Sequence, residues 1–347
     1  MGVLKDDYAI MVANNGERAL QFANATPKPD LILLDVMMPG VDGYEVCRQL
    51  KSEPKTRDIP VIFVTSLSGN SHEARGLKLG AVDFVTKPFQ PSLVLIRIRN
   101  QLELKRHRDH LEELVLERTR RIKLVQEVTI NALSTVAETR DPETGGHIMR
   151  TQNYVKVLAI HAKDHSKFSG QLDDTVIDLL YQSAPLHDVG KVGIPDSVLL
   201  KGGKLTEEEF EAMKRHTYYG RDILEKAEAR LGEVSFLNYA SEIAYTHHER
   251  WNGTGYPRGL SGDRIPLSGR LMAIADVYDA LVSKRVYKPP IPHSKVVSII
   301  EEGRGSYFDP DLADIFMQIN DEFRKVAFEF ADFDEERDVL AQEMPAT

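Results

Sequence analysis

A long stretch without turn signals, from about Ser92 to Thr139, divides the 347-residue chain into two parts of different character. Apolar or seam positions recur in it at mixed three- and four-residue spacing: Leu111, Leu114, Arg118, Ile122, Val125, Val128 and Ala132. With dense Arg, Lys and Glu between them, this pattern predicts one long helix. The helix can pair with a second copy of the chain as a coiled coil. It can equally be a single solvated connector, because Arg118 interrupts the seam.

The part before this helix alternates short apolar runs with helical patterns. The runs bounded by Pro, Asp or Gly predict buried strands over 8–13, 30–35, 60–65 and 82–87. Helical patterns begin near Gly16, Gly43 and His72. Strand-helix alternation of this kind predicts a doubly wound parallel sheet with helices on both faces.

Polar residues end three of these strands: Asp35, Thr65 and Lys87. The carboxyl ends of parallel strands meet at the ligand crevice of such a sheet. Residues 8 to about 100 resemble the flavodoxin-like receiver domain of two-component response regulators. The resemblance implies that Asp35 accepts a phosphoryl group from a cognate sensor histidine kinase, that Lys87 pairs with it and that Thr65 responds to it. It also implies that the Met37 carbonyl helps to hold Mg²⁺.

The sequence departs from the receiver pattern at its start. Receivers carry an acidic pair for Mg²⁺ after their first strand, but Asp6 and Asp7 precede the run 8–13, which matches the family's second strand. In the strand order 2-1-3-4-5 the first strand lies inside the sheet, where its backbone groups cannot stay unpaired. We therefore expect that a strand-plus-helix unit of roughly 35–45 residues is missing from the sequence.

The part after the long helix reads as mainly helical and carries clustered ionisable residues. Five histidines and two aspartates stand at helix starts or on apolar faces: His147, His187, Asp188, His216, His247, His248 and Asp276. Burying that many such groups without partners costs several kcal/mol each. Metal ions remove the cost, and imidazole with carboxylate suits Fe, Mn, Zn, Ni or Co. Two metals bridged by a carboxylate hold a hydroxide nucleophile and neutralise phosphoryl oxygens in phosphoester hydrolysis.

Three motifs follow one another in this part: "HDVGK", "HHERWNGTGYP" and "DVYDAL". From about Glu138 to Leu312 the chain resembles the HD-GYP family of HD phosphohydrolases, which implies an all-α domain that hydrolyses the messenger cyclic di-GMP to linear pGpG, to GMP or to both. The resemblance implies that one metal is bound by His147, His187 and Asp276, the second by His216, His247 and His248, and that Asp188 bridges the two. Lys191 lies three residues after Asp188 on the same helical face and can donate toward the phosphate or the leaving oxygen.

Further positions carry two interpretations each. Glu143 is either a ligand of a third metal or a carboxylate favoured by a helix N-terminus. Arg285 and Lys288 match family positions that hold the substrate phosphates, but they also suit a solvated basic turn. Tyr256 contacts substrate or packs its loop.

Composition narrows the function classes. A formal net charge of −9 argues against a protein that wraps duplex DNA. No run of membrane length and no signal-peptide pattern is present, so we expect a cytoplasmic protein without membrane insertion. The single cysteine, Cys47, excludes an internal disulfide and a cysteine-based zinc site.

These observations predict four regions: a receiver domain over 1–91, a connector over 92–139, a metal phosphohydrolase domain over 140–331 and an acidic tail over 332–347 that frays. The predicted protein is a response regulator whose output domain is a binuclear metal phosphodiesterase. Two alternatives stay open. One is a phosphohydrolase that prefers linear dinucleotides or other nucleotides. The other is a degenerate domain that only binds the messenger or a partner protein.

Overall fold

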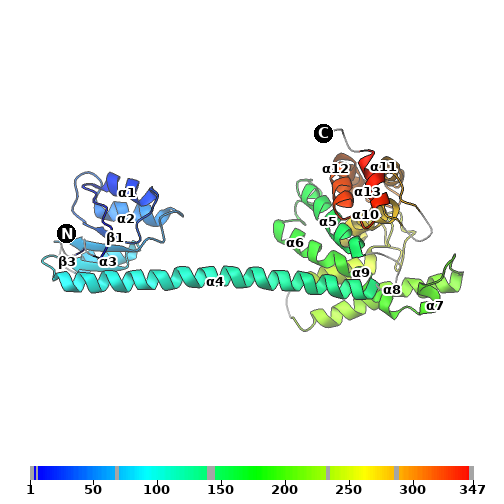
Figure 1. Cartoon of the computed structure of the whole chain (residues 1–347), viewed down its shortest axis with the longest axis horizontal. Helices are drawn as coiled ribbons and strands as arrows, with labels where there is room; N and C mark the ends of the chain where they lie inside the picture. The colour runs from blue at the N-terminus through cyan, green and yellow to red at the C-terminus, as the bar shows by residue number, and fades with distance from the viewer. Residues whose placement is uncertain are drawn as a thin grey trace. The chain divides into compact units, whose positions relative to one another are not determined.

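The computed structural model describes residues 4, 7–66, 70–138, 145–231, 235–284 and 289–343. The chain divides into two compact units, residues 1–121 and 122–347. One helix, α4 (Pro91–Glu138), has its first turns in the first unit and its last turns in the second (Figure 1).

The first unit is a three-stranded parallel sheet with helices. Its elements before α4 are α1 (Gly16–Asn24), β1 (Ile32–Leu34), α2 (Gly43–Ser52), β2 (Val61–Thr65), α3 (Asn70–Lys78) and β3 (Asp83–Thr86). The strand order is β1-β2-β3, and Ile32 lies opposite Val61. Asn15 and Asp42 cap α1 and α2 by accepting hydrogen bonds from backbone amides of the first turn. The predicted parallel sheet is confirmed for these three strands.

Both faces of this sheet are covered. On one face Phe63 and Phe84 pack with Val46 and Leu50 of α2. On the other face Ile62 and Val85 pack against Val94 and Ile98 at the start of α4. Alternation of side chains along each strand places neighbouring apolar residues in two different cores, as the apolar runs in the sequence predict.

The strand predicted over 8–13 is not formed. Ile10, Met11 and Val12 are 37%, 47% and 52% exposed, and the segment pairs with no described strand. An extended segment becomes a strand only when a neighbour supplies hydrogen-bonding backbone groups. In the expected strand order its neighbour would be the first strand of the fold, and no described residues form that strand. The expectation of a missing strand-plus-helix unit stays a prediction.

Among the described residues of the second unit, all the regular elements are helices. Its elements are the end of α4, α5 (Gly145–Ala162), α6 (Asp174–Ser183), η2 (Ala184–Leu186), η3 (Val189–Gly193), α7 (Asp196–Leu199), α8 (Glu207–Glu228), α9 (Phe236–Thr246), η4 (Gly262–Arg264), α10 (Leu267–Val282), α11 (His293–Glu302), α12 (Pro310–Glu329) and α13 (Asp334–Ala341). Among the described residues, no helix combines the length and apolarity that crossing a bilayer requires.

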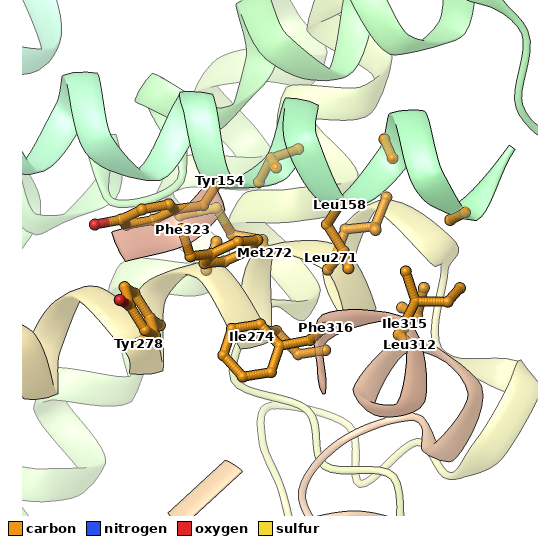
Figure 2. Close-up of a cluster of buried hydrophobic side chains, with 14 of the residues drawn as sticks. Tyr154, Leu158, Leu271, Met272, Ile274, Tyr278, Leu312, Ile315, Phe316 and Phe323 are labelled. Atoms are coloured by element: carbon orange, nitrogen blue, oxygen red, sulfur yellow. The ribbon is translucent and has the colours of Figure 1, made fainter. Parts of the chain in front are cut away.

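The main core of this unit lies between α5, α10 and α12. Figure 2 shows Tyr154 of α5, Tyr278 of α10, and Phe316 and Phe323 of α12 turned toward one another. The rings of Tyr154 and Phe323 stack with centroids 4.8 Å apart, and all four side chains are essentially buried. Aromatic contacts of this kind add to the stabilisation from buried area. They fix α5 and α10, which carry two of the candidate metal ligands.

The chain after Asp332 differs from the expected frayed tail. It forms α13, in which Leu340 is 1% exposed and belongs to the main core. The buried Glu336 accepts a hydrogen bond from the backbone amide of Lys284. One apolar side chain and one capping carboxylate are enough to anchor a segment that is acidic overall.

The end of α4 contributes to the second unit. Ile130 is 7% exposed in a small apolar cluster with Leu186, Leu224, Ala240 and Ala244. Leu186 ends η2 and directly precedes His187. The last turns of the long helix therefore support the segment that carries the first candidate ligands.

Candidate metal centre

Five separate segments bring the predicted ligands together. His147 stands in the first turn of α5, and Asp276 lies in α10. His216 lies within α8, while His247 follows the last residue of α9. The pair His187-Asp188 lies between η2 and η3. Residues far apart in the sequence thus meet at one place in the helical unit.

Gly190 explains how this pair comes so close to α8. A Cβ atom at Gly190 would lie 1.9 Å from the backbone carbonyl oxygen of His216 and 2.5 Å from the Gly220 nitrogen. Only glycine permits that approach of two backbones. The glycine of the "HDVGK" motif is therefore required to place Asp188 beside His216.

The ligand atoms form two groups. In one, atoms of His147, His187 and Asp276 lie within 4.8 Å of one another. In the other, the same holds for Asp188, His216, His247 and His248. This division matches the grouping expected from the sequence. That these side chains bind metal ions stays a prediction.

Asp188 lies between the two groups. Its Oδ2 is 3.4 Å from Nε2 of His187, and its Oδ1 is 3.3 Å from Nε2 of His216 and 3.5 Å from Nε2 of His247. Ligand atoms that share one ion at about 2.0–2.2 Å lie roughly 3–4 Å apart. The two carboxylate oxygens thus face different groups, as a bridging ligand would.

The backbone fixes the orientation of three imidazoles. Nδ1 of His187 donates to the Ala184 carbonyl at 3.0 Å, Nδ1 of His216 to the Met213 carbonyl at 2.8 Å, and Nδ1 of His247 to the Ile243 carbonyl at 2.9 Å. A carbonyl can only accept, so each Nδ1 carries the proton and each Nε2 has a free lone pair. Such hydrogen bonds orient histidine ligands in metal sites.

Three buried atoms at the centre lack hydrogen-bond partners among the described residues: Asp188 Oδ1, His216 Nε2 and His247 Nε2. An unsatisfied buried polar atom costs about 1–3 kcal/mol, and more when it is charged. A divalent cation would satisfy all three atoms at once. These unsatisfied atoms therefore indicate that the donor set fits a metal ion.

Burial favours the neutral form of three histidines, and nearby positive charge keeps Asp188 ionised. Burial lowers the pKa of the His216 imidazole to about 4, lowers the pKa of His187, and holds the pKa of His248 well below its ordinary value. Burial also acts to lower the pKa of His247, but the adjacent Asp188 carboxylate outweighs it and raises that pKa. Burial alone would raise the pKa of Asp188, but Lys191 and His187 hold it well below its ordinary value. Neutral imidazoles and an ionised carboxylate are the forms that bind metals.

Two further residues hold His147 and were not found from the sequence. Nδ1 of His147 donates to Oδ2 of Asp279 at 2.8 Å, and Nε of Arg150 donates to Oδ1 of the same carboxylate at 2.7 Å. Arg150 also donates to Oδ2 of Asp332 at 2.7 Å, and it is 1% exposed. Although burial would raise the pKa of Asp279, Arg150 keeps it below its usual range. Each of these residues stands three positions after a predicted ligand, on the same helix face, and that spacing could have revealed them.

The remaining predicted residues of this site divide into two sets. Nζ of Lys191 lies 2.7 Å from Oδ2 of Asp188, and the half-buried Tyr256 ring lies 4.7 Å from the His248 ring. Glu143, Arg285 and Lys288 fall outside the described residues.

The first unit brings its predicted residues to one edge of the sheet. Asp35 follows β1, Thr65 ends β2, and Lys87 follows β3. Nζ of Lys87 lies 2.5 Å from Oδ2 of Asp35, and the backbone amide of Lys87 donates to the Thr65 carbonyl at 2.8 Å. The backbone amide of Met37 donates to Oδ1 of Asp35 at 3.2 Å. The roles of these residues in phosphoryl transfer stay predictions.

Comparisons with known proteins agree with this architecture. The family model for the HD domain matches residues 132–312, and the model for the response regulator receiver domain matches residues 3–99. The fold and the site therefore define a receiver domain joined to an HD domain. The chain belongs to the HD domain family, among the members that are response regulators.

Three relatives show the range of similarity. A "Probable cyclic di-GMP phosphodiesterase" of Vibrio cholerae serotype O1 is 49% identical over 333 residues, which cover 94% of this chain and 75% of the relative. The "Cyclic di-GMP phosphodiesterase response regulator RpfG" of Xanthomonas campestris pv. campestris is 35% identical, over 87% of this chain and 78% of its own. A "3'3'-cGAMP-specific phosphodiesterase 2" of Vibrio cholerae serotype O1 is 43% identical, but over 55% of this chain and 34% of its own.

Proposed function

We propose that the chain is a response regulator whose HD domain is a metal-dependent phosphodiesterase that hydrolyses cyclic di-GMP to linear pGpG, to GMP or to both. The observation that carries this proposal is the pair of adjacent ligand groups that meet at Asp188, with three buried atoms lacking partners. The names of the relatives that match most of the chain support the substrate. The proposal places the protein in the cytoplasm.

Two divalent transition metals would occupy the centre. His147, His187 and Asp276 would hold one ion, His216, His247 and His248 the other, and Asp188 both. Fe, Mn, Ni, Co and Zn all accept this donor set. Glu143 is proposed as a ligand for a third ion. Such ions supply positive charge for the phosphoryl oxygens and lower the pKa of bound water.

The protein's own side chains would orient the substrate and donate hydrogen bonds to its phosphate oxygens. Lys191 holds the Asp188 carboxylate at 2.7 Å, and its ammonium can donate a hydrogen bond to a phosphate oxygen or to the leaving oxygen. Asp279 and Arg150 keep the His147 ring in place. Arg285 and Lys288 are proposed to bind the substrate phosphates, and Tyr256 to contact the substrate beside His248.

A product assay tests the reaction and its specificity. The full-length protein is incubated with cyclic di-GMP, linear pGpG or 3'3'-cGAMP at varied Mn²⁺, Fe²⁺ and Ni²⁺, and the products are separated by chromatography. Faster hydrolysis of cyclic di-GMP than of the other two is expected. Faster hydrolysis of another nucleotide would mean that this nucleotide is the substrate. The proposal of a metal-dependent reaction would then stand.

Metal analysis separates the enzyme from a degenerate binding domain. Tight binding of cyclic di-GMP without hydrolysis, by protein that carries fewer than two metal equivalents per chain, would favour the degenerate domain.

Control by the receiver domain is the second part of the proposal. We propose that a sensor histidine kinase supplies the phosphoryl group to Asp35, with Mg²⁺ offsetting its charge, and that Thr65 and Lys87 respond. Treatment of the native full-length protein with acetyl phosphate and Mg²⁺ should add one phosphoryl group by intact mass. An adduct that survives Asp35→Ala would remove Asp35 from this role.

Pairing of two chains through α4 is also proposed. Six apolar residues at heptad-compatible spacing are 57–66% exposed: Leu104, Leu111, Val115, Ile122, Val125 and Val136. Such a seam is complementary to a second copy of itself in a parallel coiled coil. Sedimentation equilibrium should detect a dimer that Val115→Glu weakens and that Glu113→Gln leaves intact. A wild-type protein that is monomeric at micromolar concentration would contradict pairing through α4.

A further inference from the structure

We infer that the Phe210 ring, which Tyr256 meets edge-on, is an aromatic platform beside the metal centre on which a nucleobase of the substrate stacks. Phe210 has no predicted role from the sequence, and the inference rests on the proposed hydrolysis of a nucleotide phosphodiester. The ligand class of this subsite is a purine base carried by a ribose phosphate.

A continuous series of rings leads outward from the candidate ligands. The Tyr256 ring lies 4.7 Å from the His248 ring at an interplanar angle of 32°. The Phe210 ring meets Tyr256 edge-on, with centroids 5.9 Å apart at 81°. Tyr256 is half-buried, whereas Phe210 is 43% exposed. The aromatic surface thus begins at a ligand imidazole and ends at solvent.

The position of Phe210 is not explained by packing of the core. It stands in the second turn of α8, the helix that also carries His216. It belongs to none of the buried clusters formed by the described residues, nor to the apolar residues that pack against them. An exposed phenyl face next to a catalytic centre offers apolar area that a flat ligand can cover.

Positive charge lies at the same place. Nζ of Lys214 is 4.8 Å from the Phe210 centroid and 5.5 Å from the Tyr256 centroid. The same ammonium is 2.6 Å from the Glu211 carboxylate, so it is held near both rings. A flat apolar face beside a cation suits a nucleotide, because the base can stack while the phosphate meets the positive charge.

The test compares two probes that differ only in the base. Guanosine 5′-monophosphate and ribose 5-phosphate are titrated calorimetrically into the metal-loaded full-length protein. Base stacking should make the nucleotide bind about tenfold more tightly, which corresponds to about 1.4 kcal/mol. In Phe210→Ala this ratio should fall to about twofold or less, with the affinity for ribose 5-phosphate unchanged. Phe210→Trp should keep the ratio.

Two further variants distinguish the contribution of base stacking from that of charge and from general effects of a substitution on α8. Lys214→Gln should weaken both probes and keep their ratio. Ile223→Ala removes another exposed apolar side chain of α8, 49% exposed, and should change neither affinity. An unchanged ratio in Phe210→Ala, or an equal loss in Ile223→Ala, would overturn the platform.

A failure of the aromatic platform can be distinguished from a failure of the proposed phosphodiesterase activity. Hydrolysis of cyclic di-GMP with the same KM in wild type and Phe210→Ala would overturn the platform and leave the phosphodiesterase intact. Absence of hydrolysis together with a base-dependent ratio that Phe210→Ala abolishes would overturn the phosphodiesterase and keep the subsite.

Discussion

Each unit of the chain contains a lysine held against an aspartate, and the two pairs differ in their surroundings. In the first unit Lys87 and Asp35 are 2.5 Å apart, with side chains 38% and 35% exposed. In the second unit Lys191 and Asp188 are 2.7 Å apart, with side chains 12% and 9% exposed. Nearly equal distances therefore describe two different electrostatic situations.

Solvent explains what the difference means. Water screens the pair in the first unit, so it contributes little to stability and its carboxylate stays accessible to an incoming group. In the second unit the carboxylate is buried among imidazoles, and its other oxygen lacks a hydrogen-bond partner among the described residues. A group in such surroundings is strongly destabilising unless a further cation completes them. The exposed carboxylate is accessible to an incoming group, whereas the surroundings of the buried one fit a bound metal ion.

Removing the buried carboxylate should have the largest effect. Asp188→Ala should reduce hydrolysis to the level of the uncatalysed control and remove at least one metal equivalent, because among the described ligand residues only this carboxylate faces both groups. Activity assays and elemental analysis of the same preparation test it. Asp174→Ala, whose side chain is 92% exposed, is the control. Full metal content with normal activity in Asp188→Ala would refute a bridging role.

Replacing a buried arginine should lower the free energy of unfolding more than replacing an exposed one. Arg150→Met leaves the Asp279 carboxylate buried without its main partner and should lower the free energy of unfolding by about 3–5 kcal/mol. Arg304→Met removes an equally short pair with Asp314 in which both side chains are 48% exposed, and should cost far less because water already screens the pair. Urea denaturation of both variants measures the difference. Equal losses would mean that burial does not decide the strength of these pairs.

Adding a metal ion should stabilise the second unit. At a Ni²⁺ concentration one hundred times Kd, the gain is about 2.7 kcal/mol, or roughly 5–10 °C in Tm for a unit of this size. The first unit has no cluster of imidazoles among its described residues, so its transition should move less. Calorimetry with chelator and with metal resolves the two transitions. The shift should vanish in Asp188→Ala, and its persistence there would place the ion elsewhere.

Breaking the exposed pair should have the smallest effect. Lys87→Met should change the free energy of unfolding of the first unit by less than about 1 kcal/mol, because water already solvates both groups. Lys163→Met, which breaks another exposed pair with Asp174, is the matched control. A loss of several kcal/mol for Lys87→Met alone would show that its pair is as costly to break as a buried one.

Much of this comparison could be predicted from the sequence. Apolar runs ending in Asp35, Thr65 and Lys87 predicted the strands whose ends meet, because side chains at the ends of parallel strands have little freedom of position. Histidines and aspartates on helical faces predicted a cluster, and the structure assembles it from five segments.

What escaped prediction depends on partners distant in the chain. The run 8–13 has the composition of a strand but no described neighbour to pair with. Asp279 and Arg150 share a helix face with predicted ligands, but their contact with each other exists only once α5 and α10 are packed together. Phe210 looks like one more apolar helix position until the loop carrying Tyr256 lies beside it.

The packing of Ile130 against Leu186 has an evolutionary consequence. A recombination event within the last turns of α4 would remove a wall of the second unit, which begins at Ile122. Viable hybrids should therefore join upstream of that residue. Each inserted residue would also shift the apolar positions of α4 by about 100° around the helix, so only some insertion lengths would keep them on one face. The helix thereby limits which other N-terminal domains can be joined to this unit in a working protein.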